Sequence, residues 1–196
     1  MVEVIRGKYK RLSMKFNENG NLIVRAPGRL SEETIKSFLV KHQSWINKQS
    51  IKVENKLKLK SSFDFTNSIY LLGEKISANG LCKKNEYISC FKEYIENRVK
   101  YLSKTLNMHF SSLSPTYSVR IWGSMDRRNN MKLNIKLAVL KKELIDYVIV
   151  HELCHSVEFN HSRKFWSRVE EIIPDYKKIK KEIDSYDFIL REDIFN

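Results

Sequence analysis

The chain has 196 residues, 42% of them hydrophobic, and a formal net charge of +13. At this length and apolar content it can bury a core without disulfides, and its three cysteines, an odd number, suit a reducing compartment. Its apolar runs are shorter than the roughly 18 residues that a membrane span needs, and residues 1–11 lack the apolar core of a secretory signal, so we expect a cytoplasmic protein without membrane contact.

The first 60 residues predict a β-hairpin followed by a basic helix. Residues 8–16 and 22–26 are two extended runs, and the Asn- and Gly-rich segment between them is typical of a hairpin turn. Ser31 then caps a helix whose apolar stripe reaches Gln49. Residues 52–60 have no apolar face, which indicates a solvated helix end and linker. We interpret residues 1–60 as an elaboration of the same domain and residues 61–196 as the catalytic region.

Positive charge is concentrated in this N-terminal part. Residues 1–60 carry 14 Lys and Arg against 5 Asp and Glu, whereas residues 141–196 carry 10 against 12. A basic surface attracts nucleic acid or other anions. No recognised nucleic-acid-binding module accompanies the charge, so we expect weak, non-specific nucleic-acid binding at most.

The middle of the chain predicts short strands and one long helix. Strands are expected at 69–72, 75–78, 87–90, 116–122 and 131–137, and an amphipathic helix at 91–110. Strands followed by helices favour an α+β fold. An edge strand beside the next helix could bind an extended peptide, and Trp122-Gly123-Ser124 would then border the cleft. The alternative is that Trp122 belongs to the core and that Gly123 forms a bulge.

Residues 151–155 read H-E-L-C-H, and a further histidine follows at position 161. On a helix, His151 and His155 lie one turn apart on one face, so both can reach a single zinc ion. Glu152 lies one step round the helix and can act on a water molecule at the metal. The six-residue spacing from His155 to His161 lets the helix end and the chain return a third imidazole. Three protein ligands leave one zinc position open, which is typical of a catalytic site.

The residues around this motif predict two helices. Asn160 tolerates the left-handed conformation that ends a helix, and Ser162 is a candidate cap for the next one, which Pro174 ends. We interpret Cys154, inside the motif, as a small packing residue rather than a ligand. An apolar stripe predicts that the metal-binding helix spans residues 141–159 and is buried through Leu140, Leu144, Ile145, Val148, Ile149 and Leu153.

Two sequence elements resemble a known family. Residues 147–155 (Y-V-I-V-H-E-L-C-H), followed by N-H-S and F-W, are similar to the signature of the YgjP-like family of zinc metallopeptidases, which is distantly similar to SprT-like and WLM metallopeptidases. The family's W-G-S…L-N…L element is matched by Trp122-Gly123-Ser124, Leu133-Asn134 and Leu137. The resemblance covers nearly the whole chain. It implies a small mixed or antiparallel sheet packed on a zincin-type metal-binding helix, with a helical C-terminus.

Two positions of the family pattern stay without a role at this stage. The family's cysteine after W-G-S is Met125 here, so a metal or redox role at that position has no support. Asn134 matches the pattern, but the residue type and its position alone assign it no function.

The leading hypothesis is a zinc-dependent hydrolase acting on peptides or unfolded proteins, with zinc held by His151, His155 and His161 and with Glu152 moving the proton. One alternative is a zinc hydrolase of nucleotides or phosphoanhydrides, which the basic surface suits although no Gly-rich phosphate loop is present. The other is a nucleic-acid-associated protein with a zincin-like fold and a structural or lost metal. Against the latter, structural zinc sites usually have four ligands and are rich in cysteine.

Overall fold

A computed structural model of the protein describes residues 1–77 and 84–194. The chain divides into two compact units, Met1–Phe63 and Asp64–Asn196, which we call the N-terminal unit and the C-terminal unit. Both combine helices with small sheets of two or three strands, so the α+β prediction is confirmed. The interpretation of residues 1–60 as an elaboration of one domain, with residues 61–196 as its catalytic region, stays a prediction. Within the described residues, no helix has the length and apolar character to cross a membrane.

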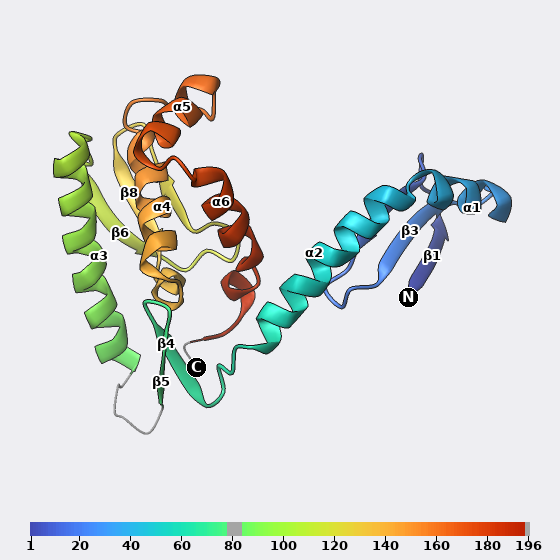
Figure 1. Cartoon of the computed structure of the whole chain (residues 1–196), viewed down its shortest axis with the longest axis horizontal. Helices are drawn as coiled ribbons and strands as arrows, with labels where there is room; N and C mark the ends of the chain where they lie inside the picture. Colours follow the sequence, from blue (N-terminus) through green and yellow to red (C-terminus); the bar gives the residue numbers. More distant parts are fainter. Residues whose placement is uncertain (78–83, 195–196) are drawn as a thin grey trace. The chain divides into compact units, whose positions relative to one another are not determined.

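The N-terminal unit is a three-stranded sheet with two helices (Figure 1). The predicted hairpin is present as β2 and β3, which pair antiparallel, but its first strand is shorter than the predicted run 8–16 because residues 8–12 are not part of it. A first strand, which the sequence patterns did not reveal, pairs parallel to β3, so the sheet order is β1-β3-β2. Its core is small and is formed by Leu22, Val24, Ala26 and Ile35. The elements are β1 (Val2–Gly7), β2 (Ser13–Phe16), β3 (Leu22–Pro27), α1 (Glu32–Lys41) and α2 (Gln43–Ser61).

The helical segment of this unit differs from the single helix predicted. The helix is interrupted at His42, whose φ of −104° and ψ of 15° are not helical. Helix α1 ends before this residue and α2 begins after it. The helix then continues to Ser61 rather than becoming a linker. None of its residues is buried, as the lysine-rich composition of residues 52–60 indicated.

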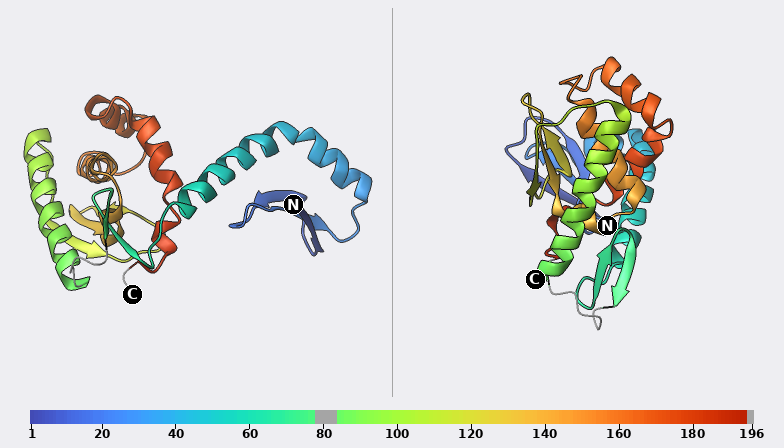
Figure 2. Two further views of the ribbon diagram at one scale, coloured as in Figure 1. Left: turned by 60° about the horizontal axis from the view of Figure 1, so that its bottom comes forward. Right: turned by 90° about the vertical axis from the view of Figure 1, so that its left-hand side faces the viewer.

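The C-terminal unit is built around α4, which carries the H-E-x-x-H motif (Figures 1 and 2). Helices α3, α5 and α6 and strand β7 all contact α4. The strands form a hairpin, β4-β5, and a mixed sheet in which β6 is parallel and β7 antiparallel to the central β8. The elements are β4 (Ser68–Leu71), β5 (Glu74–Ser77), α3 (Lys84–Leu106), β6 (Ser112–Thr116), β7 (Gly123–Met125), β8 (Asn130–Asn134), a 3-10 helix (Ile135–Val139), α4 (Lys142–Cys154), α5 (Arg163–Ile172), α6 (Tyr176–Ser185) and a second 3-10 turn (Ile189–Arg191).

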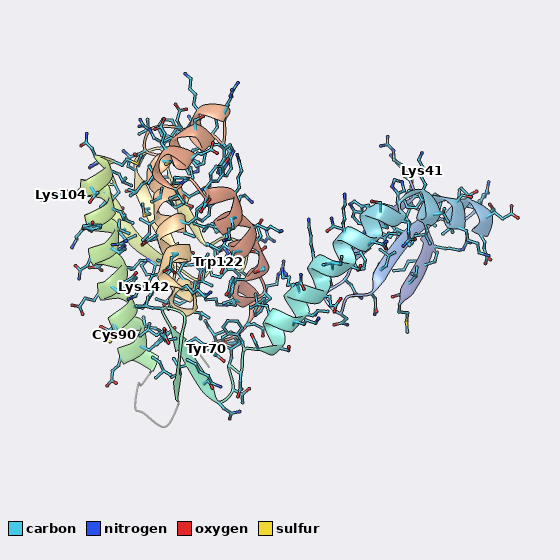
Figure 3. All side chains as sticks on the ribbon, in the orientation of Figure 1. Lys41, Tyr70, Cys90, Lys104, Trp122 and Lys142 are labelled. Atoms are coloured by element: carbon cyan, nitrogen blue, oxygen red, sulfur yellow. The ribbon has the colours of Figure 1, made fainter. Side chains whose placement is uncertain are left out.

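One predicted strand of this unit is part of a helix. Residues 87–90 belong to α3, which begins at Lys84. The side chain of Tyr87 is buried, and its hydroxyl donates to the Tyr70 carbonyl at 2.6 Å, so this residue extends the buried stripe of Phe91 by one helical turn. Figure 3 marks Tyr70 on the hairpin that α3 contacts in this way and Cys90 on the exposed side of α3. The end of the predicted strand 75–78, at Ala78, lies outside the described residues.

The region before the motif helix also differs from the prediction. Residues 117–121 alternate like a strand, yet Tyr117, Val119 and Ile121 are all exposed and belong to an irregular segment. The residues between the two predicted strands, 116–122 and 131–137, instead contain β7. The predicted strand over 131–137 ends at Asn134, whose side-chain oxygen accepts from the Lys136 amide and begins a 3-10 helix.

The motif helix is shorter than predicted. Helix α4 ends at Cys154 with His155 as its C-cap, and Asn160 does not end it. Asn160 also lacks the positive φ that we expected there, since the described non-glycine residues with positive φ are Leu72, Asn107 and Asn129. Five residues are thereby free to turn the chain back towards the helix. Ser162 does cap α5, as predicted, by accepting from the Phe165 amide.

Candidate metal centre and substrate cleft

Helix α4 and the loop that follows it bring three histidines together. The rings of His151 and His155 lie one helical turn apart, with centroids 5.2 Å from each other. The loop returns His161 so that its Nε2 lies 3.0 Å from Nε2 of His151. One ring nitrogen from each of the three lies within 4.8 Å of the others, and among the described residues this is the set of three that could hold a metal ion. The sequence motif had named the same three residues.

Hydrogen bonding and packing orient the imidazoles. Nδ1 of His155 donates to the Glu158 carbonyl at 2.9 Å, which leaves Nε2 with its lone pair facing the other histidines. Phe165, fully buried at the start of α5, stacks on His155 with centroids 4.5 Å apart. Trp166 stacks on His161 at 5.6 Å. The F-W pair of the sequence signature therefore forms the wall behind the histidines.

The electrostatics keep two of these histidines neutral. Burial lowers the pKa of His151 to about 3, and the charges of His155, His161 and Lys180 add to the effect. Burial also lowers the pKa of His161, with contributions from His155 and Lys180. Neutral imidazoles are the form that binds metal ions. The buried Nδ1 of His151 has no hydrogen-bond partner among the described residues.

Glu152 lies directly beside the histidines in the interior of the unit. Its side chain is 5% exposed, and burial raises its pKa to about 8. A Cβ atom added to Gly123 would lie 2.9 Å from Cγ and 2.9 Å from Oε1 of Glu152. Glycine at this position therefore lets strand β7 approach the carboxylate more closely than any other residue would allow.

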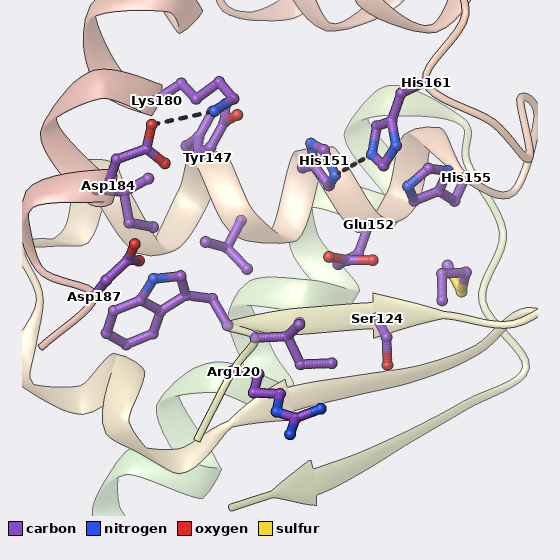
Figure 4. A pocket seen from close by; sticks show the side chains of 16 residues that line it. Arg120, Ser124, Tyr147, His151, Glu152, His155, His161, Lys180, Asp184 and Asp187 are labelled. Atoms are coloured by element: carbon purple, nitrogen blue, oxygen red, sulfur yellow. Dashed lines mark hydrogen bonds and ion pairs between the residues drawn. The ribbon is translucent and has the colours of Figure 1, made fainter. Parts of the chain in front are cut away.

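A cavity of about 530 Å³ joins the histidines to strand β7 (Figure 4). Its walls include His151, Glu152, His155 and His161 on one side and Trp122-Gly123-Ser124 on the other. The structure thus brings together all seven residues predicted for the site. Two interpretations of Trp122 and Gly123 were open: a place at the cleft, or a core residue followed by a bulge. The structure agrees with the first, because both residues line the cavity and the backbone at Gly123 lies close to Glu152. Met125, which replaces the family's cysteine, also lines the cavity.

Asn134 holds the segment that leads into β7. It is fully buried, and its Nδ2 donates to the carbonyls of Ser118 at 2.7 Å and Ile121 at 2.9 Å. Its backbone amide donates to the Trp122 carbonyl at 2.8 Å. The side chain of Asn134 therefore binds two backbone carbonyls that a neighbouring strand would otherwise pair with. This explains why residues 118–121 are irregular. Apart from the L-N pair of the family pattern, no local sequence signal indicated this role.

Several residues of the cavity were missed by the sequence patterns, among them Tyr147, Lys180 and Asp184. Tyr147, one turn before His151 on α4, is buried, and burial raises its pKa further above its usual value. Lys180 and Asp184, on α6, line the same cavity and pair with each other at 3.2 Å. The lysine-rich pattern of α6 is typical of a solvated helix, so no local signal distinguished Lys180 from its neighbours. Cys154 is fully buried, and burial raises its pKa to about 12, which confirms a packing role.

Comparison with known families decides the class of this protein. The model of the YgjP-like metallopeptidase domain matches residues 10–86 and 82–186. The chain belongs to this family. It is therefore a metallopeptidase, and its three clustered histidines could hold the metal. A search of curated proteins found no match.

Two solved structures are similar to part of the chain. One is the metallopeptidase zymogen of Pyrococcus abyssi abylysin, with 21% identity over 45% of this chain and 90% of that chain, and a TM-score of 0.42. The other is the metallopeptidase zymogen of Methanocaldococcus jannaschii jannalysin, with 22% identity over 47% and 95% and a TM-score of 0.42. Both similarities are weak and cover less than half of this chain.

Proposed function

We propose that this protein is a zinc-dependent peptidase in which His151, His155 and His161 hold the metal and Glu152 is the general base. The observation that carries the proposal is the cluster of three imidazole nitrogens within 4.8 Å, beside a carboxylate that is 5% exposed, at the wall of a cleft. Metallopeptidase chemistry favours peptides over the phosphoanhydrides and nucleic acids of the two alternative hypotheses.

The donor set fits zinc. Imidazole nitrogens are ligands that zinc prefers, and three protein ligands leave a position for water or substrate. The lowered pKa values of His151 and His161 keep both imidazoles neutral at neutral pH, so protons do not compete with the metal for their nitrogens. Cys154 is not a competing ligand because it is buried with a raised pKa. When bound, the ion polarises a water molecule and the scissile carbonyl as a Lewis acid.

Glu152 supplies the proton transfers of the reaction. As a carboxylate it accepts a proton from the attacking water, whose oxygen forms the new bond to the carbonyl carbon. When the C–N bond breaks, Glu152 returns that proton to the leaving nitrogen. A raised pKa, caused by burial, suits a group that must both accept and release a proton near neutral pH.

Strand β7 is the proposed platform for the substrate. It stands at the end of the sheet order β6-β8-β7 and pairs with β8 on one side. An extended peptide can add to such an edge through main-chain hydrogen bonds. Trp122 and Ser124 flank Gly123 along the same cavity, so we assign all three to substrate binding. This arrangement accepts an extended segment, which suits unfolded proteins.

Two variants test the assigned roles against each other. Glu152→Gln should abolish cleavage of a dye-labelled unfolded protein and retain the metal content of the parent, because the amide cannot accept a proton and the residue is not a ligand. His161→Ala should lose metal and activity together, because two histidines leave the metal under-coordinated. Metal content is measured after purification without added metal, and activity is measured before and after a chelator.

The same preparation should leave nucleoside triphosphates uncleaved. If Glu152→Gln stayed active, or lost its metal, the role of Glu152 would be wrong. If His161→Ala kept both metal and activity, the third ligand would lie elsewhere.

A further inference from the structure

Helix α6 directs one of its lysines into the cleft. Residues 177, 178, 180 and 181 of this helix are all lysines, and of these four Lys180 lines the cavity that contains the histidines. Lys177, Lys178 and Lys181 are exposed, whereas Lys180 is partly buried. Helix α6 packs against α4, and Lys180 lies at the cavity that α4 also lines.

Lys180 and the three histidines line the same cavity. In Figure 4 Nζ of Lys180 lies beside Tyr147, one helical turn before His151 on α4, where it pairs with Asp184. Arg120 also lines the cavity, but Figure 4 shows its guanidinium directed away from the histidines. Lys180 is thus the cation on the histidine side of the cleft.

Asp184 holds this lysine in place. Its Oδ2 accepts from Nζ of Lys180 at 3.2 Å, one helical turn further along α6. An ammonium group has three N–H donors, so this ion pair leaves two for other partners. Asp187 also lines this end of the cavity, which adds a second acidic group to its wall. The side chain of Lys180 is 45% exposed, so a substrate can reach the remaining donors.

We propose that Lys180 is a catalytic residue that stabilises the oxyanion of the peptide-bond hydrolysis, and that Asp184 is its positioning residue; this rests on the peptidase function proposed above. When water attacks, the π electrons of the carbonyl move onto its oxygen, while the proton of the water goes to Glu152. An N–H of Lys180 donates to that oxygen. As the intermediate collapses, the carbonyl re-forms, the C–N bond breaks and Glu152 returns its proton to the nitrogen. Lys180 keeps its own proton throughout.

The N–H donor of Lys180 would stabilise the negative charge that develops on the carbonyl oxygen in the transition state. A group that acts in the transition state alone lowers kcat and kcat/KM equally when it is removed, whereas a group that anchors the substrate raises KM. Loss of a single oxyanion donor typically lowers kcat by about 100-fold or more. The split between kcat and KM therefore separates the proposed role from simple substrate binding.

The experiment compares variants of the metal-loaded full-length protein on dye-labelled unfolded casein and on a fluorogenic peptide with either a free or an amidated C-terminus. Lys180→Met should lower kcat by about 100-fold on all of them. KM, metal content and melting temperature should stay near those of the parent. Lys180→Arg should recover part of the loss, and Asp184→Asn should lower kcat by a smaller factor. Lys181→Met, an exposed neighbour outside the cavity, is the matched control and should leave kcat unchanged.

Three results would overturn the proposal. The first is a Lys180→Met enzyme with parental kcat while Glu152→Gln is inactive, which would leave the peptidase function standing. The second is a rise in KM confined to the free-carboxylate peptide, which would make Lys180 an anchor for the substrate terminus. The third is loss of metal from folded Lys180→Met, which would give the residue a structural role. If Lys180→Met fails to fold, Lys180→Gln is measured by the same criteria.

Discussion

Helices α2 and α4 show how differently the two units use a helix. Helix α2 has 19 residues, none of them buried, and four lysines in its second half. Helix α4 has 13 residues, nine of them buried, and is covered by α3, α5, α6 and β7. A helix surrounded by other elements holds its side chains in fixed positions. The polar residues His151 and Glu152 therefore stand on the most constrained helix of the chain.

The two units also differ in charge and in core. The N-terminal unit carries 14 Lys and Arg against 5 Asp and Glu and buries a handful of side chains. Most of the fully buried large side chains, including Ile149, Leu153 and Phe165, lie in the C-terminal unit. The comparison predicts that chemistry depends on the C-terminal unit and that changes in the N-terminal unit leave it intact.

The largest effect is expected from Gly123→Ala at the border of the cleft. The added methyl group would lie 2.9 Å from Glu152 Cγ and 3.1 Å from Leu133 Cδ2, so Glu152 or β7 must shift. A displacement of about 1 Å in a catalytic group costs about 100-fold in rate, and we expect kcat to fall by that order. Gly28→Ala, in the N-terminal unit, is the control, because its methyl group would meet an ordinary contact of 3.9 Å. Parental activity of Gly123→Ala would show that the close approach of β7 to Glu152 is dispensable.

A medium effect is expected from the same truncation in each core. Ile149→Ala removes a fully buried side chain from α4 and should lower the free energy of unfolding by about 2–5 kcal/mol. Ile35→Ala, in the small N-terminal core, should lie at the lower end of that range and leave kcat unchanged. Urea denaturation and peptidase assays measure both. A strong loss of activity in folded Ile35→Ala would break the comparison, since it would tie the N-terminal unit to catalysis.

The smallest effect is expected from charge reversal on α2. Replacing Lys52, Lys56, Lys58 and Lys60 by Glu should leave turnover unchanged, because α2 belongs to the N-terminal unit. The parent should bind duplex DNA within the non-specific range of about 10⁻⁴–10⁻⁶ M at physiological salt, and the variant more weakly. Binding is measured by fluorescence anisotropy as a function of salt concentration. Tighter binding by the parent, with a steep salt slope lost in the variant, would make this helix a nucleic-acid docking surface.

The sequence by itself determined the three candidate metal ligands and the elements that local patterns encode. The four-residue spacing of His151 and His155, with Glu152 between them, places both imidazoles on one face only if the segment is a helix. Ser162 is a residue type that caps helices, and it predicted the start of the next helix. The hairpin of β2 and β3 and the buried stripe of α4 were predicted from periodicity and turn chemistry. These features depend on residues close together in the chain, so their physics is complete within a short window.

Only the tertiary structure decided which distant groups meet at the cleft. The alternation of residues 117–121 predicted a strand, but the buried amide of Asn134 takes the carbonyls of Ser118 and Ile121 and keeps that segment irregular. The contact of Gly123 with Glu152, and the cavity that Lys180 and His151 share, likewise join residues about 30 positions apart. Periodicity states which face of an element is apolar, but not which partner covers it. Each of these contacts depends on packing between elements, so it is fixed once β7, α4 and α6 are assembled.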